Sequence, residues 1–106
     1  MSNEHFTSFR DFYPYYLQEH RNGYCRLCHF VGTTGVLFIL VGFIWFQNWM
    51  LLIALPFMGY GFAWVGHFIF EKNKPATFRH PLYSLIADFV MYFDILRGTV
   101  PLLGNR

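Results

Sequence analysis

The chain has 106 residues, of which 55% are hydrophobic and 23% aromatic, whereas only 13% are charged. An ordinary soluble domain carries about 25% charged residues, and a chain this short has too little interior to bury so many large apolar side chains. This composition excludes a disordered chain and argues against a soluble monomer. The net charge of +2, with no basic cluster, argues against a nucleic-acid partner. Two cysteines are too few for a disulfide framework.

The N-terminal part of the chain is aromatic and polar rather than uniformly apolar. Residues 6–19 form a weakly amphipathic segment that Pro14 interrupts, and residues 21–23 (Arg-Asn-Gly) predict a break before a helix that begins near Tyr24. Because charged residues are scattered through the first 26 positions, we expect no cleavable signal peptide.

The central feature is a stretch without charges. No Asp, Glu, Lys or Arg lies between Arg26 and Glu71. This stretch is about twice as long as the ~20 residues that cross a bilayer as a helix. Residues 47–48, a Gln-Asn pair, divide it into two predicted spans, residues 30–46 and 49–70, joined by a tight turn. The sequence therefore predicts an integral membrane protein built on a helical hairpin.

A third helical segment follows over residues 84–96, which is too short for a comfortable crossing and is expected to lie at the interface or partly within it. The basic residues near the hairpin lie before the first span or after the second: Arg10, Arg21, Arg26, Lys72, Lys74 and Arg79. The positive-inside rule then predicts that both termini are cytoplasmic. We expect a multi-pass, all-α protein whose residues 1–106 form one membrane domain.

The histidines are the residues best suited to bind a metal or to take part in a reaction. A hairpin brings the start of the first span and the end of the second to one membrane face, so His29 and His67 are expected to be neighbours. His67 and Glu71 are four residues apart and would share a helical face. His20 is nine residues from His29 and joins them only if the chain bends at residues 22–23. Imidazole and carboxylate ligands with open positions suit non-haem Fe(II) and oxygen chemistry.

Other interpretations of these residues remain open. Residues 25–29 (C-R-L-C-H) match the attachment pattern of c-type haem, but the basic residues place them on the inner side of the membrane. As a zinc site the motif is incomplete, and the cysteines are otherwise small packing residues. Interfacial histidines can lie near headgroups, and Glu71 can pair with Lys72 or Lys74. Asp88, in an apolar helix, is a candidate partner for a ligand histidine.

Two blocks of the chain resemble the Mpo-type family of small membrane proteins. The first covers residues 16–33 (YLQEHRNGYCRLCHFVGT), and the second covers residues 59–78 (GYGFAWVGHFIFEKNKPATF) and 81–89 (PLYSLIADF). The element G-H-x-x-F-E-K-x-x-P-A is fairly specific. The chain departs from the family pattern in the first block, where Gly23 and Cys25 replace a proline and an asparagine.

This resemblance implies an iron(II)-dependent dioxygenase that uses O2 to shorten 2-hydroxy fatty acids by one carbon at the cytoplasmic face of a lipid bilayer. It implies metal ligation by His20, His29 and His67, with Glu71 as a fourth ligand or as a catalytic residue that orients His67. On this interpretation, the substrate carboxylate is held by cationic side chains: Arg26, Lys72 and Lys74. His80 is a weaker candidate. The alternative is a non-enzymatic membrane scaffold or transporter subunit, and either protein can form oligomers.

Overall fold

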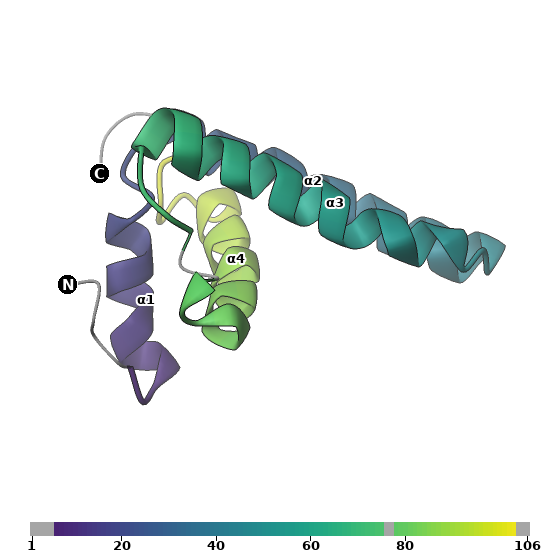
Figure 1. Cartoon of the computed structure of the whole chain (residues 1–106), viewed down its shortest axis with the longest axis horizontal. Coiled ribbons are helices and arrows are strands. Elements are labelled where there is room, and N and C mark those ends of the chain that lie inside the picture. Colours follow the sequence, from purple (N-terminus) through teal and green to yellow (C-terminus); the bar gives the residue numbers. More distant parts are fainter. Residues whose placement is uncertain (1–5, 76–77, 104–106) are drawn as a thin grey trace.

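The computed structural model describes residues 6–75 and 78–103, and within these ranges all regular secondary structure is helical. The helices are α1 (Phe9–Gln18), α2 (Gly23–Phe46), α3 (Met50–Val65), the π-helix η1 (Gly66–Glu71) and α4 (Pro81–Leu96). α2 and the continuous α3–η1 segment form a long hairpin, and α1 and α4 lie together against its open end (Figure 1). The prediction of an all-α helical hairpin is confirmed.

The two arms of the hairpin have the length and composition of membrane spans. α2 has 24 residues and α3 with η1 has 22, and an 18-residue stretch within each arm has a mean hydropathy of 2.1 and 1.5, respectively. Their large apolar side chains point outward: Phe38 is 73% exposed, Trp45 79% and Phe57 75%. Such a continuous apolar surface is stable in lipid and unfavourable in water.

The first arm begins at Gly23, close to the helix start that the sequence predicted near Tyr24 and well before the predicted span of residues 30–46. The reason is a side-chain cap on the preceding residue. Asn22 Oδ1 accepts hydrogen bonds from the backbone N–H groups of Tyr24 (2.8 Å) and Cys25 (3.3 Å), so the helix is stable before the apolar stretch starts. As a consequence, His29 lies inside a helix and not at its first turn.

The predicted turn between the arms is confirmed. Gln47 ends α2 in the left-handed conformation with φ 54°, and Asn48 Oδ1 accepts the N–H of Met50 at 3.0 Å. Farther down the hairpin the two backbones approach closely. A Cβ atom on Gly32 would lie 3.0 Å from Cβ of Phe62, so a larger residue at this position would push the helices apart.

The second arm ends in a π-helix rather than in the expected α-helix. The carbonyl of His67 accepts the π-helical hydrogen bond from the N–H of Lys72, five residues ahead, and a further one from the N–H of Asn73 at 3.0 Å. A Cβ atom on Gly66 would lie 3.1 Å from Cα, O and Sγ of Cys25, so only glycine lets η1 approach α2 this closely. π-Helical segments are frequent at functional sites, and this one carries a histidine.

The compact core of the protein lies outside the hairpin, between α1 and α4. It consists of buried aromatic and aliphatic side chains: Phe12, Tyr16, Leu17, Ala87, Met91 and Val100. The far end of α4 is fastened by Asp94, which accepts a hydrogen bond from the Tyr13 hydroxyl at 2.6 Å and forms an ion pair with Arg97. α4 begins at Pro81, three residues before the predicted start, because proline is favoured in the first helical turn.

The arrangement makes a testable prediction about topology. In a variant without native cysteines, a cysteine at Asn48 should react with an impermeant maleimide in intact cells, because the turn is expected on the outer side. Cysteines at the exposed positions Arg10 and Lys74 should react only after permeabilisation. Labelling of all three positions from the same side would contradict a hairpin that crosses the membrane.

Candidate metal centre

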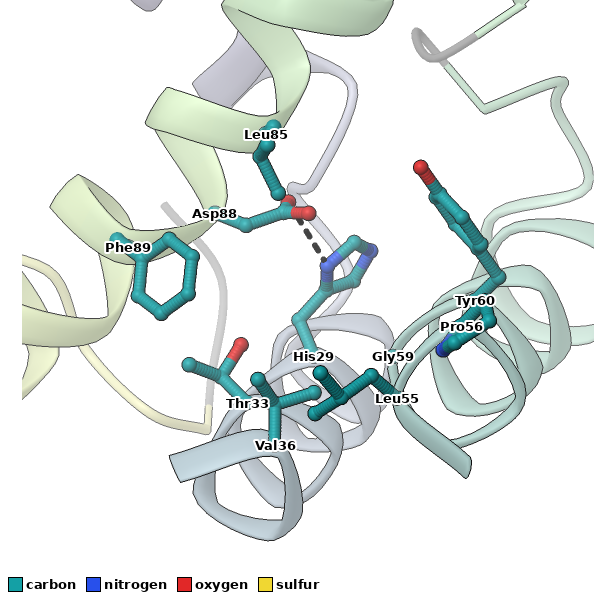
Figure 2. Close-up of a pocket in the computed structure, with 10 residues that line it drawn as sticks. All are labelled: His29, Thr33, Val36, Leu55, Pro56, Gly59, Tyr60, Leu85, Asp88 and Phe89. Atoms are coloured by element: carbon teal, nitrogen blue, oxygen red, sulfur yellow. Dashed lines mark ion pairs between the residues drawn. The ribbon is translucent and has the colours of Figure 1, made fainter. Parts of the chain in front are cut away.

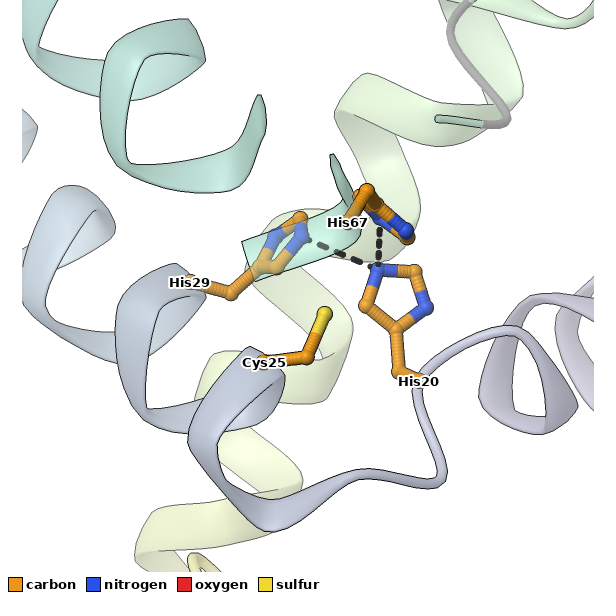
Figure 3. A group of neighbouring side chains, drawn as sticks. All are labelled: His20, Cys25, His29 and His67. Atoms are coloured by element: carbon orange, nitrogen blue, oxygen red, sulfur yellow. Dashed lines mark hydrogen bonds between the residues drawn. The ribbon is translucent and has the colours of Figure 1, made fainter. Parts of the chain in front are cut away.

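Three histidines from different elements meet at the open end of the hairpin (Figure 3). His20 follows α1, His29 lies in α2 and His67 lies in η1. All three are buried, with exposed fractions of 0%, 6% and 1%. Nε2 of His20 lies 3.0 Å from Nε2 of His29 and 2.9 Å from Nε2 of His67. The chain bends over residues 21–22, one residue earlier than the bend expected at residues 22–23, and this bend brings His20 to the other two.

The opposite ring nitrogen, Nδ1, has an oxygen partner in His20 and in His67. Nδ1 of His20 donates to the carbonyl oxygen of Tyr16 at 2.6 Å, and Nδ1 of His67 donates to Oδ1 of Asn73 at 2.7 Å. The orientation of the Asn73 amide is fixed because its Nδ2 donates to the carbonyl oxygen and to Oε1 of Glu19. Carbonyl oxygens only accept, so the proton of each of these rings is on Nδ1.

His29 has an anionic partner. Its Nδ1 lies 3.4 Å from Oδ1 of Asp88 in α4, as Figure 2 shows. The same carboxylate oxygen accepts a hydrogen bond from the hydroxyl of Tyr16. Burial, and then the negative charge of Asp88, raise the pKa of Tyr16, so this phenol remains a donor at physiological pH. Asp88 therefore favours a proton on Nδ1 of His29, as carboxylates do for histidines that bind a metal through Nε2.

With the protons of His20 and His67 on Nδ1, their Nε2 atoms, 2.9 Å apart, present bare lone pairs to each other. A neutral imidazole has one donor and one acceptor nitrogen, so no hydrogen bond is available between the Nε2 atoms of these two rings. Burial and the neighbouring His29 and His67 lower the pKa of His20, which keeps this ring neutral. Imidazole nitrogens bond to divalent metals at about 2.0–2.1 Å, so two such ligands at a right angle stand about 3 Å apart. The donor set fits a transition-metal ion.

A fourth potential donor was not expected from the sequence. Sγ of Cys25 and one ring nitrogen from each of the three histidines all lie within 4.8 Å of one another, and this buried group can hold a metal ion. The thiol is fully buried and packs against Gly66. Cys25 and His29 are four residues apart on α2, and this spacing could have predicted from the sequence that both side chains face the same site.

Glu71 does not belong to this group. Its Oε2 accepts a hydrogen bond from the backbone N–H of Asn22, and Nδ1 of His67 contacts Asn73 instead. The expectation that Glu71 and His67 share a face assumed α-helical geometry. In the π-helix the turn is wider, so residues four apart are no longer stacked as they are in an α-helix. Metal ligation by Glu71 stays a prediction.

The cationic residues expected to hold a carboxylate lie in different surroundings. Arg26 is fully buried, and its guanidinium donates to the carbonyl oxygens of Pro101 (2.7 Å) and His20 (2.8 Å). It therefore holds the backbone that carries His20. Lys72 and Lys74 are exposed on the segment that follows η1. Substrate binding by these three residues stays a prediction.

His80, the weaker candidate ligand, lies apart from the cluster. It precedes the first turn of α4, and its ring packs against those of Phe6 and Phe12, with centroid separations of 5.3 Å in both cases. Within the described residues it is not a member of the metal-binding group.

A family model described as 2-hydroxy-palmitic acid dioxygenase Mpo1-like matches residues 6–100. The chain belongs to this family. The match includes every helix and all residues of the histidine cluster, so the resemblance seen in the two sequence blocks extends over the whole described fold. No curated protein and no solved structure matches the chain. The family name supports a dioxygenase-like enzyme with a fatty-acid substrate.

The buried position of His20 predicts that acid destabilises the metal-free protein. The unfolded chain takes up a proton on His20 near the ordinary pKa of 6.5, whereas burial lowers the pKa in the folded protein. The free energy of unfolding that the low pKa of His20 contributes is therefore complete above about pH 6.5. It is lost as pH falls below this value, by up to about 1.4 kcal/mol per pH unit. Thermal unfolding in detergent with a chelator measures this, and His20→Gln should reduce the pH dependence. Equal pH dependence of unfolding in the wild type and in His20→Gln would contradict a lowered pKa of His20 in the folded protein.

The contact between Asp88 and His29 gives a second prediction. Asp88→Asn preserves the shape of the side chain but removes its charge, and we expect a loss of about 10–100-fold in metal affinity. Competition with a chelator of known affinity measures the loss. Asp94→Asn is the matched control, because this carboxylate lies in the same helix but contacts Tyr13 and Arg97 rather than a histidine. Similar losses in both variants would show that Asp88 acts only through the stability of α4.

Proposed function

We propose that the chain is an Fe(II)-dependent dioxygenase that shortens 2-hydroxy fatty acids by one carbon at a membrane surface. The observation that carries the proposal is the meeting of three buried Nε2 atoms, from rings whose Nδ1 atoms each face an oxygen of the protein. Membership of a family named for 2-hydroxy-palmitic acid dioxygenase supports both the reaction and the substrate class.

The ligands in this proposal are His20, His29 and His67. Bound Fe(II) would supply a centre that activates O2 and polarises the hydroxyl and carboxylate oxygens of the substrate. A site with three protein ligands leaves positions free for small molecules, which suits a reaction with two substrates. Cys25 keeps its role as a small side chain that lets α2 and η1 pack closely, so we expect no thiolate ligand.

The other residues of the site hold the ligands in place and exclude water. Asp88 makes His29 a stronger electron donor, and the Tyr16 hydroxyl keeps the Asp88 carboxylate in position. Arg26 fixes the carbonyl of His20, which makes it a positioning residue in this proposal. Lys72 and Lys74 are exposed cations at the end of η1 and would attract an anionic carboxylate to this face of the molecule.

Single substitutions in the cluster test the ligand set. Alanine at His20, His29 or His67 removes a nitrogen donor, so each variant should lose nearly all bound iron and all oxygen uptake with 2-hydroxypalmitic acid. The protein is purified without oxygen in detergent, reconstituted with Fe(II), and assayed for metal content and oxygen consumption. His80→Ala should retain wild-type iron. Equal loss of iron in His80→Ala and His67→Ala would show that the ligand set is wrong.

Two further variants separate the remaining donors. Glu71→Gln keeps an oxygen that can accept the Asn22 N–H, so iron should fall by no more than about 10–100-fold in affinity, as for a residue outside the ligand set. Cys25→Ser and Cys28→Ser should both keep iron. In the cobalt-substituted protein, a thiolate-to-metal absorption band that disappears in Cys25→Ser but persists in Cys28→Ser would make Cys25 a ligand.

A further inference from the structure

A pocket of about 270 Å³ lies beside the histidine cluster, where α2, α3 and α4 meet (Figure 2). This volume is near the lower end of the range for small-molecule sites. One wall is formed by His29 and Asp88, so the pocket adjoins the cluster directly. The cavity is thus placed to bring a ligand to the residues that the proposed function uses.

The pocket has a polar end and an apolar end. Its wall on α2 consists of His29, Thr33 and Val36, which are successive positions on one helical face. Seven residues of α-helix span about 10 Å, so the pocket extends that far from the histidine toward the tip of the hairpin. At the distant end the opposing wall on α3 is formed by Leu55 and Pro56. These residues belong to the two candidate membrane spans, so the apolar end lies within the predicted bilayer.

A buried hydroxyl lies in a second, smaller cavity beside the polar end of the pocket. This cavity shares His29, Tyr60 and Asp88 with the pocket and is also lined by Ser84 and His67. Oγ of Ser84 is buried, with a residue exposure of 2%, and has no hydrogen-bond partner among the described residues. A buried polar group without a partner is unfavourable in a folded protein and indicates a group that binds there.

We propose that this pocket holds the first part of the acyl chain of a 2-hydroxy acid, with its hydroxyl and carboxylate end directed toward Ser84 and His29. The proposal rests on the proposed function, which supplies the substrate class. The pocket is about 10 Å long and the hydrocarbon core of a bilayer about 30 Å thick. The remainder of a long chain therefore continues into lipid, and the protein discriminates among substrates by the atoms near the carboxylate rather than by total chain length.

A pair of glycines on α3 provides a matched test. Gly59 lines the pocket, and a Cβ atom there would lie 3.4 Å from Cγ2 of Val36, whereas a Cβ atom on Gly61 would meet nothing within 4 Å. Gly59→Leu and Gly61→Leu add the same side chain to the same helix. We expect Gly59→Leu to lower oxygen uptake with 2-hydroxypalmitic acid by at least about tenfold, the loss typical of a pocket obstructed by added methylene groups, and Gly61→Leu to leave it within about twofold. Bound iron should be unchanged in both.

Two further readouts complete the test. With 2-hydroxybutyric acid, whose tail is too short to reach the obstruction, Gly59→Leu and the wild type should have similar rates. Without oxygen, a 2-hydroxy fatty acid with a diazirine in its chain should label Leu55 or Phe89 in the wild type, in competition with 2-hydroxypalmitic acid. Label confined to the exposed outer face, such as Ile53, would overturn the proposal.

The outcomes separate the pocket from the enzyme activity. A wild-type protein that binds no iron and consumes no oxygen contradicts the proposed function, while the labelling experiment still decides whether the pocket binds the acid. An active wild type whose Gly59→Leu variant behaves like Gly61→Leu with the long acid overturns the pocket and leaves the enzyme assignment intact. If Gly59→Leu loses iron, its activity no longer tests the pocket. The positions labelled in the wild type then decide whether the pocket binds the acid.

Discussion

Three buried imidazoles whose Nε2 atoms converge are the feature on which the rest of this structure depends. The arrangement is unfavourable without a cation, because the acceptor nitrogens of His20 and His67 face each other with no hydrogen between them. The protein nevertheless enforces it through three separate oxygen partners, the Tyr16 carbonyl, Asp88 and Asn73, which lie on or near three different helices. α1, α4 and the segment after η1 each contribute one partner, and this accounts for their position around the open end of the hairpin.

The charged residues near this end connect the elements that carry the ligands. Buried Arg26 has five N–H donors that need acceptors, and it donates to carbonyls that precede α2 and follow α4. Glu71 joins the end of η1 to the start of α2 through the Asn22 N–H. These contacts fix the relative positions of His20, His29 and His67, which the apolar contacts of the two spans could not do alone, because lipid provides an equally apolar alternative.

Much of this architecture could be predicted from the sequence, because its signals are local. The absence of charges between residues 26 and 71 predicted the hairpin, the Gln-Asn pair predicted its turn, and the position of His29 and His67 at opposite ends of that stretch predicted their approach. The role of Asn73 could not be predicted, because it depends on a π-helical turn that no simple periodicity reveals. The start of α2 was predicted to within one residue from the Arg-Asn-Gly break, whereas the Asn22 side-chain cap that fixes this start was not recognised.

The location of the cluster at the base of the hairpin suits the amphiphilic acid that the proposed function assigns as substrate. A carboxylate is costly to place in the hydrocarbon core, whereas its acyl chain is most stable there. A reaction at the carbons next to the carboxylate must therefore take place where the polar and apolar regions meet. His29 occupies that position in the described fold: its Nε2 faces the other imidazoles, its Nδ1 faces Asp88, and the pocket beside it runs along the helices toward Val36 and Leu55. In the proposed function, one residue thus joins the site of chemistry to the apolar space that a fatty acid requires.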